Sequence, residues 1–215
     1  VLVGPPGTGK SLLANCFAEA LNGNFFQYLI TRFTTPDELL GHFSLKELKD
    51  NDEYVRKIAN KLPDAQIAFL DECFKASSSL QNSLLTILNE REIDIGNGTR
   101  QKTSLEMVIG ASNEYPIGKE LAALWDRWLF RRHVSLSRKF SDVFRIMTDD
   151  TLGKCRVKFS MEDLEKIRED RKWVDINSVM DEIRQLHAFC KGNEIHVSDR
   201  RWRKVSKVIQ SRAAM

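Results

Sequence analysis

Eight residues near the start of this 215-residue chain have the types and the spacing needed to hold a chain of phosphates. They fill each fixed position of the pattern Gly-x-x-x-x-Gly-Lys-Ser/Thr and read Gly4, Pro5, Pro6, Gly7, Thr8, Gly9, Lys10, Ser11. An apolar run precedes the motif and an amphipathic stretch over residues 11–21 follows it, which is the strand-to-helix context that the pattern requires. Glycines let successive backbone N–H groups turn toward phosphate oxygens, and the positive end of the helix adds to the attraction.

The last two residues of the motif carry the charge and the metal ligand. Lys10 is expected to reach the β- and γ-phosphates of ATP, and the Ser11 hydroxyl is expected to ligate Mg²⁺. Leu12, the next residue, completes the predicted nucleotide-binding set. The alternative is a purely structural glycine-rich turn, which the strand, the Lys-Ser pair and the helix together disfavour.

Two acidic residues end a later, strongly apolar run of the sequence. Residues 67–70, Ile-Ala-Phe-Leu, are typical of a buried parallel strand, and Asp71 and Glu72 come directly after them. Open α/β sheets present ligand-binding residues at this end of their strands. We therefore expect Asp71 to hold Mg²⁺ through a coordinated water, and Glu72 to orient and deprotonate the water that attacks the γ-phosphate. The alternative for Glu72 is an exposed acid at a helix start.

A polar residue, Asn113, follows a further apolar run at residues 107–111. At this place an amide side chain can hydrogen-bond the attacking water or a phosphate oxygen, so Asn113 is predicted to act as a sensor between the acids and the γ-phosphate. An asparagine at a strand end is often only a turn former, which is the competing interpretation.

The elements that must position these residues alternate along the first two thirds of the chain. Strands are predicted at residues 25–30, 67–70 and 107–111, a hairpin at 92–98, and helices at 11–21, 35–40, 52–62 and 80–88. This order predicts an α/β fold of the P-loop NTPase type, with a mostly parallel sheet between helical layers. Later elements are all predicted to be helical, at 141–148, 160–170, 175–191 and 199–212. We therefore expect a nucleotide-binding domain over residues 1–140 and a small all-helical lid domain over residues 141–215.

Taken in this order, the motifs resemble those of the MoxR family of AAA+ ATPases. Besides the phosphate-binding loop, the resemblance rests on residues 69–77 (FLDECFKAS), 84–91 (LLTILNER), 111–114 (ASNE), 121–128 (LAALWDRW) and 198–202 (SDRRW). Phe74 and Lys75 look most like the RavA-type branch of that family. The likeness covers nearly the whole chain, and it implies Mg-dependent ATP hydrolysis.

The resemblance also gives several arginines a role that a monomer would leave unused. Members of the family usually form hexameric rings with ATP between neighbouring subunits, and one arginine reaches the neighbour's γ-phosphate. Here that finger falls on Arg127, with Arg131 and Arg132 as rivals and a surface salt bridge as the alternative. The second sensor of the lid falls on Arg200, with Arg201 as its rival and a solvated basic helix as the alternative.

Two insertions and one missing segment are implied by the same resemblance. The insertions fall near residues 32–49 and 93–105 and are expected to face the ring pore or a partner. The chain lacks the segment that normally precedes the phosphate-binding loop and helps to enclose adenine, so we expect its N-terminus to be truncated. Relatives commonly work with proteins that carry von Willebrand A domains, which implies a chaperone-like role in remodelling protein clients.

Charge and composition leave two competing functions open. Residues 1–150 carry a net charge of −2 and residues 151–215 one of +5, so a nucleic-acid-directed motor is one alternative. An ATP-binding scaffold without turnover is the other, although its motifs would usually be eroded. The four cysteines and four histidines show no metal-ligand spacing, and no apolar run reaches the roughly 18 residues of a membrane span. A reduced, cytoplasmic protein is therefore expected.

Overall fold

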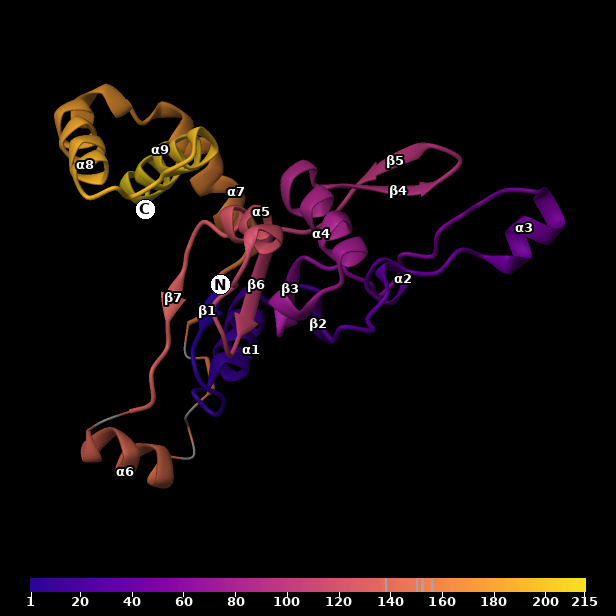
Figure 1. The fold of residues 1–215 in the computed structure, drawn as a ribbon, viewed down its shortest axis with the longest axis horizontal. Coiled ribbons are helices and arrows are strands. Elements are labelled where there is room, and N and C mark those ends of the chain that lie inside the picture. Colours follow the sequence, from indigo (N-terminus) through magenta and orange to yellow (C-terminus); the bar gives the residue numbers. More distant parts are fainter. Residues whose placement is uncertain (138, 150, 152, 156) are drawn as a thin grey trace. The chain divides into compact units, whose positions relative to one another are not determined.

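The computed structural model describes residues 1–137, 139–149, 151, 153–155 and 157–215 (Figure 1). The chain divides into two compact units, Val1–Lys158 and Phe159–Met215. The boundary predicted between residues 140 and 141 separates a nucleotide-binding domain from a lid domain by their functions, and it stays a prediction. Among the described residues, no helix is both long enough and apolar enough to cross a membrane.

A parallel sheet forms the centre of the first unit. Its strands are β1 (Leu2–Val3), β2 (Phe25–Leu29), β3 (Ile67–Asp71), β6 (Met107–Ser112) and β7 (Arg132–His133). They lie in the order β2-β3-β6-β1-β7, and every neighbouring pair is parallel. Because parallel strands end at the same edge of a sheet, the residues that follow β1, β3 and β6 come together there. The predicted α/β class with a mostly parallel sheet is confirmed.

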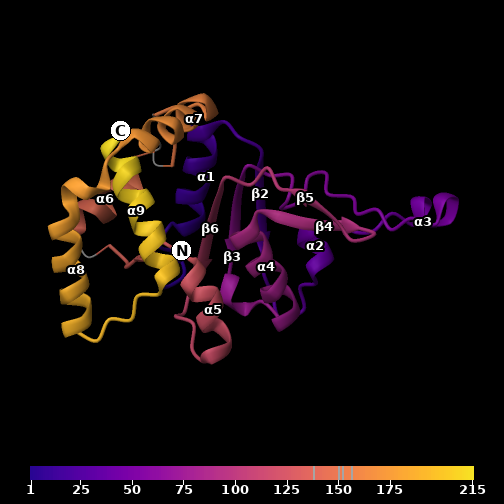
Figure 2. The same ribbon diagram turned by 90° about the horizontal axis from the view of Figure 1, so that it is seen from above.

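Helices cover both faces of this sheet. They are α1 (Lys10–Leu21) on one face, and α4 (Ser78–Glu90) and α5 (Lys119–Arg127) on the other (Figure 2). The side chains of β3 alternate between two cores, so Phe69 packs with Ala14 of α1, whereas Leu70 belongs to the core that contains Leu84 of α4. Phe69 and Leu70 are each 0% exposed, as an apolar strand buried on both faces should be.

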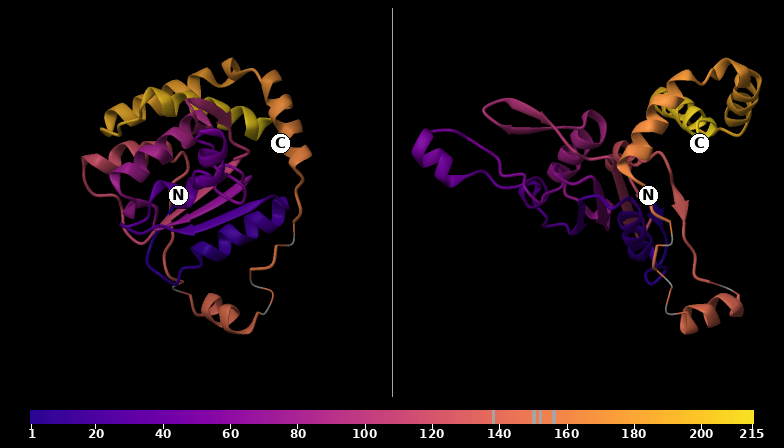
Figure 3. Two further views of the ribbon diagram at one scale, coloured as in Figure 1. Left: turned by 90° about the vertical axis from the view of Figure 1, so that its right-hand side faces the viewer. Right: turned by 180° about the vertical axis from the view of Figure 1, so that it is seen from behind.

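Parts of both predicted insertions extend away from the sheet, whereas Leu39 and Leu40 of the first one lie in the main core (Figure 2). Their elements are α2 (Pro36–Leu40), α3 (Leu45–Asn51) and an antiparallel hairpin of β4 (Glu92–Gly96) and β5 (Thr99–Lys102). Figure 3 shows α3 and the hairpin reaching out on the same side of the unit. The segment after the first predicted insertion pairs with the hairpin, since the backbone N–H of Arg56 donates to the carbonyl oxygen of Ile95 at 2.8 Å. The side chain of Arg56 also pairs with Asp37 of α2 at 2.6 Å.

The predicted helix over residues 52–62 is wrong. The helix forms earlier, as α3, because Ser44 caps its start and Asp52 ends it in a left-handed conformation, φ 55°. The following residues instead pair with distant backbone, since Ser44 N donates to Val55 O and Arg56 N donates to Ile95 O, both at 2.8 Å. Tertiary pairing therefore overrides the local helical pattern.

The remaining elements are helical. They are η1 (Cys73–Lys75) and α6 (Phe140–Thr148) in the first unit, then α7 (Met161–Asp170), η2 (Arg171–Trp173), η3 (Ile176–Val179), α8 (Met180–Gly192) and α9 (Asp199–Ala213) in the second. A capping box between Ser160 and Asp163 starts α7 where the sequence predicts it. The helix predicted over 175–191 is two elements, because Asp175 accepts from Asn177 N at 2.9 Å and opens a 3₁₀ turn before α8.

Candidate nucleotide-binding site

The residues that follow β1 form a loop whose backbone shape suits phosphate binding. Gly7 and Gly9 take left-handed angles, φ 79° and 78°, which glycine adopts without steric cost. Gly4 is required by close packing, since a Cβ there would lie 1.9 Å from the carbonyl oxygen of Val134. Adding a Cβ to Gly7 or Gly9 would meet no described atom within 4 Å, so this part of the loop faces open space.

The loop runs directly into α1, and all eight motif residues lie in the loop or in the first turn of this helix. Within the described residues no side chain caps the N-terminus of α1, and its first turn holds no acid. The first N–H groups of a helix lack intrahelical partners and attract anions. Lys10, Ser11 and Leu12 are its first three residues, and Leu12 is 48% exposed. The backbone N–H donors at the start of α1 are therefore suited to a phosphate group.

Lys10 is buried, and its ammonium meets three oxygen atoms. Nζ donates to the carbonyl oxygens of Gly4 at 2.7 Å and Pro5 at 2.9 Å, and to Oδ1 of Asn113 at 3.0 Å. Only 8% of Lys10 is exposed, so these contacts offset the cost of removing a charge from water. The cation thus stands between the phosphate-binding loop and the end of β6.

Asn113 joins Lys10 to Glu72. Its Nδ2 donates to Oε1 of Glu72 in a short hydrogen bond, while its Oδ1 accepts from Lys10. A lysine only donates and a carboxylate only accepts, so this orientation of the amide is the one that satisfies both neighbours. Three residues that are far apart in the sequence are therefore linked at one edge of the sheet.

Glu72 is held in an unusual backbone conformation. Its φ of 52° and ψ of 39° lie in the left-handed region, which costs energy for a residue with a Cβ. Its backbone N–H donates to Oδ1 of Asp71 at 3.0 Å, and its side chain is only 10% exposed. Lys75 Nζ lies 3.4 Å from Oε2 of Glu72. Sequence reasoning did not pair Lys75 with Glu72, although their three-residue spacing was visible.

Two oxygen donors at this edge suit Mg²⁺, a hard cation. They are the Ser11 hydroxyl on α1 and the Asp71 carboxylate at the end of β3. Among the described residues, no group of three or more His, Cys, Asp or Glu side chains is arranged to hold a metal alone. Nucleotide-bound Mg²⁺ usually takes only one or two protein ligands beside phosphates and water. The donor set therefore fits.

The predicted arginines occupy different surroundings. Arg131 packs within the unit, since its Cζ lies 4.3 Å from the centroid of the Trp125 ring and its Nη2 donates to the Trp125 carbonyl at 2.8 Å. Arg127 is half-buried at the end of α5, and Arg132 is exposed on β7. Arg200 lies on α9 of the second unit. The packing of Arg131 disfavours it as a finger, and the roles of Arg127 and Arg200 stay predictions.

A cavity of about 920 Å³ adjoins Glu72 in the first unit. Its wall includes Glu72 and Asn113, two cationic residues, Arg32 and Lys75, and the hydroxyl of Ser77. Both ends of the Glu72–Lys75 ion pair therefore reach this cavity.

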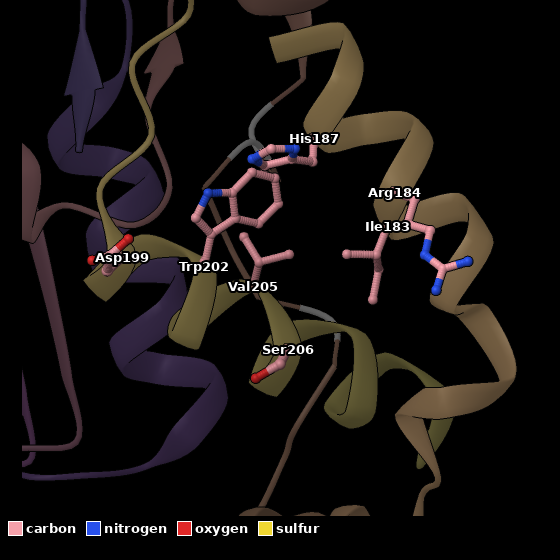
Figure 4. A pocket seen from close by; sticks show the side chains of 7 residues that line it. All are labelled: Ile183, Arg184, His187, Asp199, Trp202, Val205 and Ser206. Atoms are coloured by element: carbon pink, nitrogen blue, oxygen red, sulfur yellow. The ribbon is translucent and has the colours of Figure 1, made fainter. Parts of the chain in front are cut away.

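A second cavity, of about 540 Å³, lies between α8 and α9 in the second unit. Figure 4 shows His187 and Trp202 meeting at one end of it, with ring centroids 5.7 Å apart. Ile183 and Val205 point toward each other from the two helices, whereas the Arg184 guanidinium points away (Figure 4). Of the described residues that line it, none is a predicted nucleotide ligand.

Family models match most of the chain. Residues 1–147 match the model of the MoxR domain in MoxR–vWA–beta-propeller ternary systems. Residues 175–215 match a model of an AAA lid domain. The first match covers the whole parallel sheet and the loop after β1, and the second covers α8 and α9.

Individual proteins are also similar to this chain. Two uncharacterized proteins of Methanocaldococcus jannaschii are each 43% identical over 98% of this chain, which spans 56% and 55% of their lengths. The chain thus spans about half the length of these relatives. Chaperone MoxR1 of Mycobacterium tuberculosis is 26% identical over 62% of the chain and 35% of that protein. A candidate ATPase of Cytophaga hutchinsonii shares the fold with a TM-score of 0.59 at 21% identity, over 80% of this chain and 52% of that one.

Proposed function

Because this chain belongs to the MoxR family of AAA+ ATPases, we propose that it binds ATP with Mg²⁺ and hydrolyses the bond between the β- and γ-phosphates. The observation that carries the proposal is the run of hydrogen bonds from Lys10 through Asn113 to Glu72. It links a cation beside the phosphate-binding loop, an amide sensor and a buried carboxylate. These are the three kinds of group that hydrolysis of a phosphoanhydride needs.

Each residue receives a role that its surroundings permit. The N–H groups of the loop and the Lys10 ammonium hold the phosphates and neutralise charge on the transferring phosphoryl group. Glu72 accepts a proton from water as the water oxygen bonds to the γ-phosphorus and the bond to ADP breaks. Asn113 keeps the Glu72 carboxylate in place. When bound, Mg²⁺ supplies further charge neutralisation, with Ser11 and Asp71 as the protein residues that would hold it.

We further propose that the active form is a ring, with each nucleotide at a subunit boundary. Arg127 would then supply a cation to the neighbouring subunit's γ-phosphate, which makes hydrolysis depend on assembly. Arg200 of the lid would contact the nucleotide of its own subunit. Within this proposal, the ring is a hexamer and the chain belongs to the RavA-like branch.

The output of the ring is proposed to be chaperone-like remodelling of protein partners. Support comes from the similarity to the chaperone MoxR1 and from the MoxR–vWA–beta-propeller description of the matching family. A protein with a von Willebrand A domain is accordingly the proposed partner. The helix α3 and the hairpin, which extend from the sheet on one side, offer a surface for such contacts.

Turnover by mixed subunits tests this proposal. We would measure phosphate release against protein concentration for the intact protein, for Glu72→Gln, for Arg127→Ala and for an equimolar mixture of the two variants. We expect turnover per subunit to rise with concentration, each variant to be nearly inactive and the mixture to recover part of the activity. Linear turnover that survives Arg127→Ala would remove the shared site and leave an ATPase that works without neighbours.

A further inference from the structure

We propose that Cys16 and Cys155 form a reversible disulfide with each other when the protein meets a small organic disulfide such as oxidised glutathione, and that this bond slows ATP turnover. The effect on turnover rests on the proposed function, whereas the disulfide itself does not. The two cysteines lie near opposite ends of the sequence of the first unit, so their spacing in the sequence predicts no pairing. The fold brings their segments together on α1.

The first observation is that the chain around Cys155 lies along one side of α1. Cys16 Sγ donates to the carbonyl oxygen of Gly153 at 2.9 Å. The backbone N–H of Cys155 donates to Oε2 of Glu19 at 3.4 Å. Residues three apart on a helix are neighbours on its surface, so Cys16 and Glu19 share one side of α1. Cys155 therefore lies on the side of the helix that carries Cys16.

The second observation is the close packing of Gly153 against the same helix. A Cβ at Gly153 would lie 2.4 Å from Cδ1 of Leu12, which precedes Cys16 by one turn. Gly153 also has a φ of 89°, which glycine adopts without steric cost. The segment 153–155 thus meets α1 at three positions on successive turns. A larger residue than glycine would keep it away from the helix.

The third observation is that Cys155 is close enough to Cys16 for a local movement to join them. Gly153 touches Cys16, and two residues of fully extended chain span at most about 7 Å. A disulfide joins Cα atoms about 4.4–6.8 Å apart. Cys155 Sγ donates to the carbonyl oxygen of Val157 at 3.0 Å, and because a thiol is a weak donor, giving up this contact costs little.

Both thiols are also accessible to a small oxidant. Cys16 and Cys155 are partly exposed, whereas Cys73 is buried. In the part of the chain that the structure describes, no group of three or more His, Cys, Asp or Glu side chains is arranged to hold a metal, so no such site competes for these sulfur atoms. Disulfides in a reducing compartment are usually transient and sense the redox state, which is the behaviour proposed for this pair.

The reaction is two steps of thiol–disulfide exchange. The thiolate of one cysteine attacks a sulfur of oxidised glutathione, which forms a mixed disulfide and releases one glutathione thiolate. The second cysteine thiolate then attacks the protein sulfur of the mixed disulfide, so that the bond between the cysteines forms and the second glutathione leaves. The protein loses two electrons and two protons, and the oxidant is reduced to two thiols. Excess reduced glutathione reverses both steps.

The bond would tie together two parts of the chain that matter for turnover. The helix α1 begins with Lys10 and Ser11, which are proposed to hold phosphate and Mg²⁺. The segment 153–155 comes shortly before Phe159, where the second unit begins. Conformational steps often limit kcat in enzymes, and a covalent tie at this place restricts movement of the chain between the units. We therefore expect oxidation to lower kcat by at least about twofold and reduction to restore it.

A disulfide map and a turnover assay on the same samples of intact protein test this inference. We would equilibrate the protein with oxidised or reduced glutathione, block free thiols, digest it without reduction and identify linked peptides by mass spectrometry. The unchanged protein is expected to show a Cys16–Cys155 link and a lower kcat only when oxidised. Cys16→Ser and Cys155→Ser are expected to show neither. Cys190→Ser is the matched control, because Cys190 is also partly exposed but lies on α8, and it is expected to behave like the unchanged protein.

The outcomes separate this inference from the proposed function. Oxidised protein that carries only glutathione adducts, or only links between chains, would overturn the disulfide. A complete Cys16–Cys155 link that leaves kcat unchanged, or a loss of kcat on oxidation that persists in Cys155→Ser, would overturn its effect on turnover. If the reduced protein shows no Glu72-dependent turnover, the proposed function falls together with that effect, while the disulfide map still decides the pairing. Thermal unfolding of each reduced variant checks that it remains folded.

Discussion

Replacing Asn113 by aspartate tests how strictly the site depends on one amide. The change keeps the size of the side chain but turns the group that donates to Glu72 into a carboxylate. In the structure Nδ2 of Asn113 donates to Glu72, and Oδ1 accepts from Lys10 at 3.0 Å. Asn113→Asp therefore keeps a partner for Lys10, removes the donor to Glu72 and sets two carboxylates against each other.

The size of the effect follows from the lost hydrogen bond. A hydrogen bond to a charged group contributes about 1.5–3 kcal/mol, and the lower end applies because Asn113 itself is exposed. At 1.36 kcal/mol per tenfold, about 1.5 kcal/mol corresponds to at least a tenfold fall in kcat. KM for ATP is expected to change little, because Lys10 keeps its oxygen partner.

The assay is phosphate release at saturating Mg-ATP, together with binding of a fluorescent nucleotide. Asn177→Asp is the matched control, since Asn177 also donates its Nδ2 to a carboxylate, that of Asp175 at 2.9 Å, on the second unit. The control is expected to keep its kcat. A folded Asn113→Asp protein with kcat within twofold of the unchanged protein would refute the role given to this amide.

Three further predictions concern stability and reactivity. A methyl group at Gly4 would lie 1.9 Å from the Val134 carbonyl oxygen, so Gly4→Ala is expected to lower the free energy of unfolding by about 1–3 kcal/mol. Thermal unfolding measures this, with Gly192→Ala, whose Cβ meets no described atom within 4 Å, as the control. Burial raises the pKa of the Cys73 thiol above its ordinary value of 9.0, so Cys73 is expected to alkylate more slowly at pH 8 than the partly exposed cysteines, as mass spectrometry can report. Because the unfolded thiol then loses its proton first, the free energy of unfolding is expected to fall as the pH rises past about 9, which urea unfolding at pH 8 and 10 checks.

Features that depend on neighbouring residues were predictable from the sequence. The run at residues 67–70 forms β3 because four consecutive apolar residues suit a strand that is buried on both faces. The hairpin turn at Gly96, Asn97 and Gly98 forms where glycine and asparagine can take positive φ, and all three do. The phosphate-binding loop lies between a strand and a helix for the same local reason.

Features that depend on distant partners were not predictable. Residues 52–62 have a helical pattern, yet Arg56 pairs with the hairpin through Ile95 and with α2 through Asp37. The ion pair between Lys75 and Glu72 forms in a turn where Glu72 has a left-handed backbone. A glutamate in the sequence does not predict that conformation. Long-range pairing decided the structure of residues 52–62, and local strain decided the turn at Glu72. Neither produces a periodic pattern in the sequence.

The most direct test of the central claim separates nucleotide binding from hydrolysis at Glu72. We would measure ATP affinity and single-turnover phosphate release for the intact protein and for Glu72→Gln under the same conditions. The account predicts that Glu72→Gln binds ATP about as tightly as the unchanged protein, while its hydrolysis rate falls about 10²- to 10⁴-fold. A variant that hydrolyses ATP within a few-fold of the unchanged rate would contradict the assignment of Glu72 as the general base.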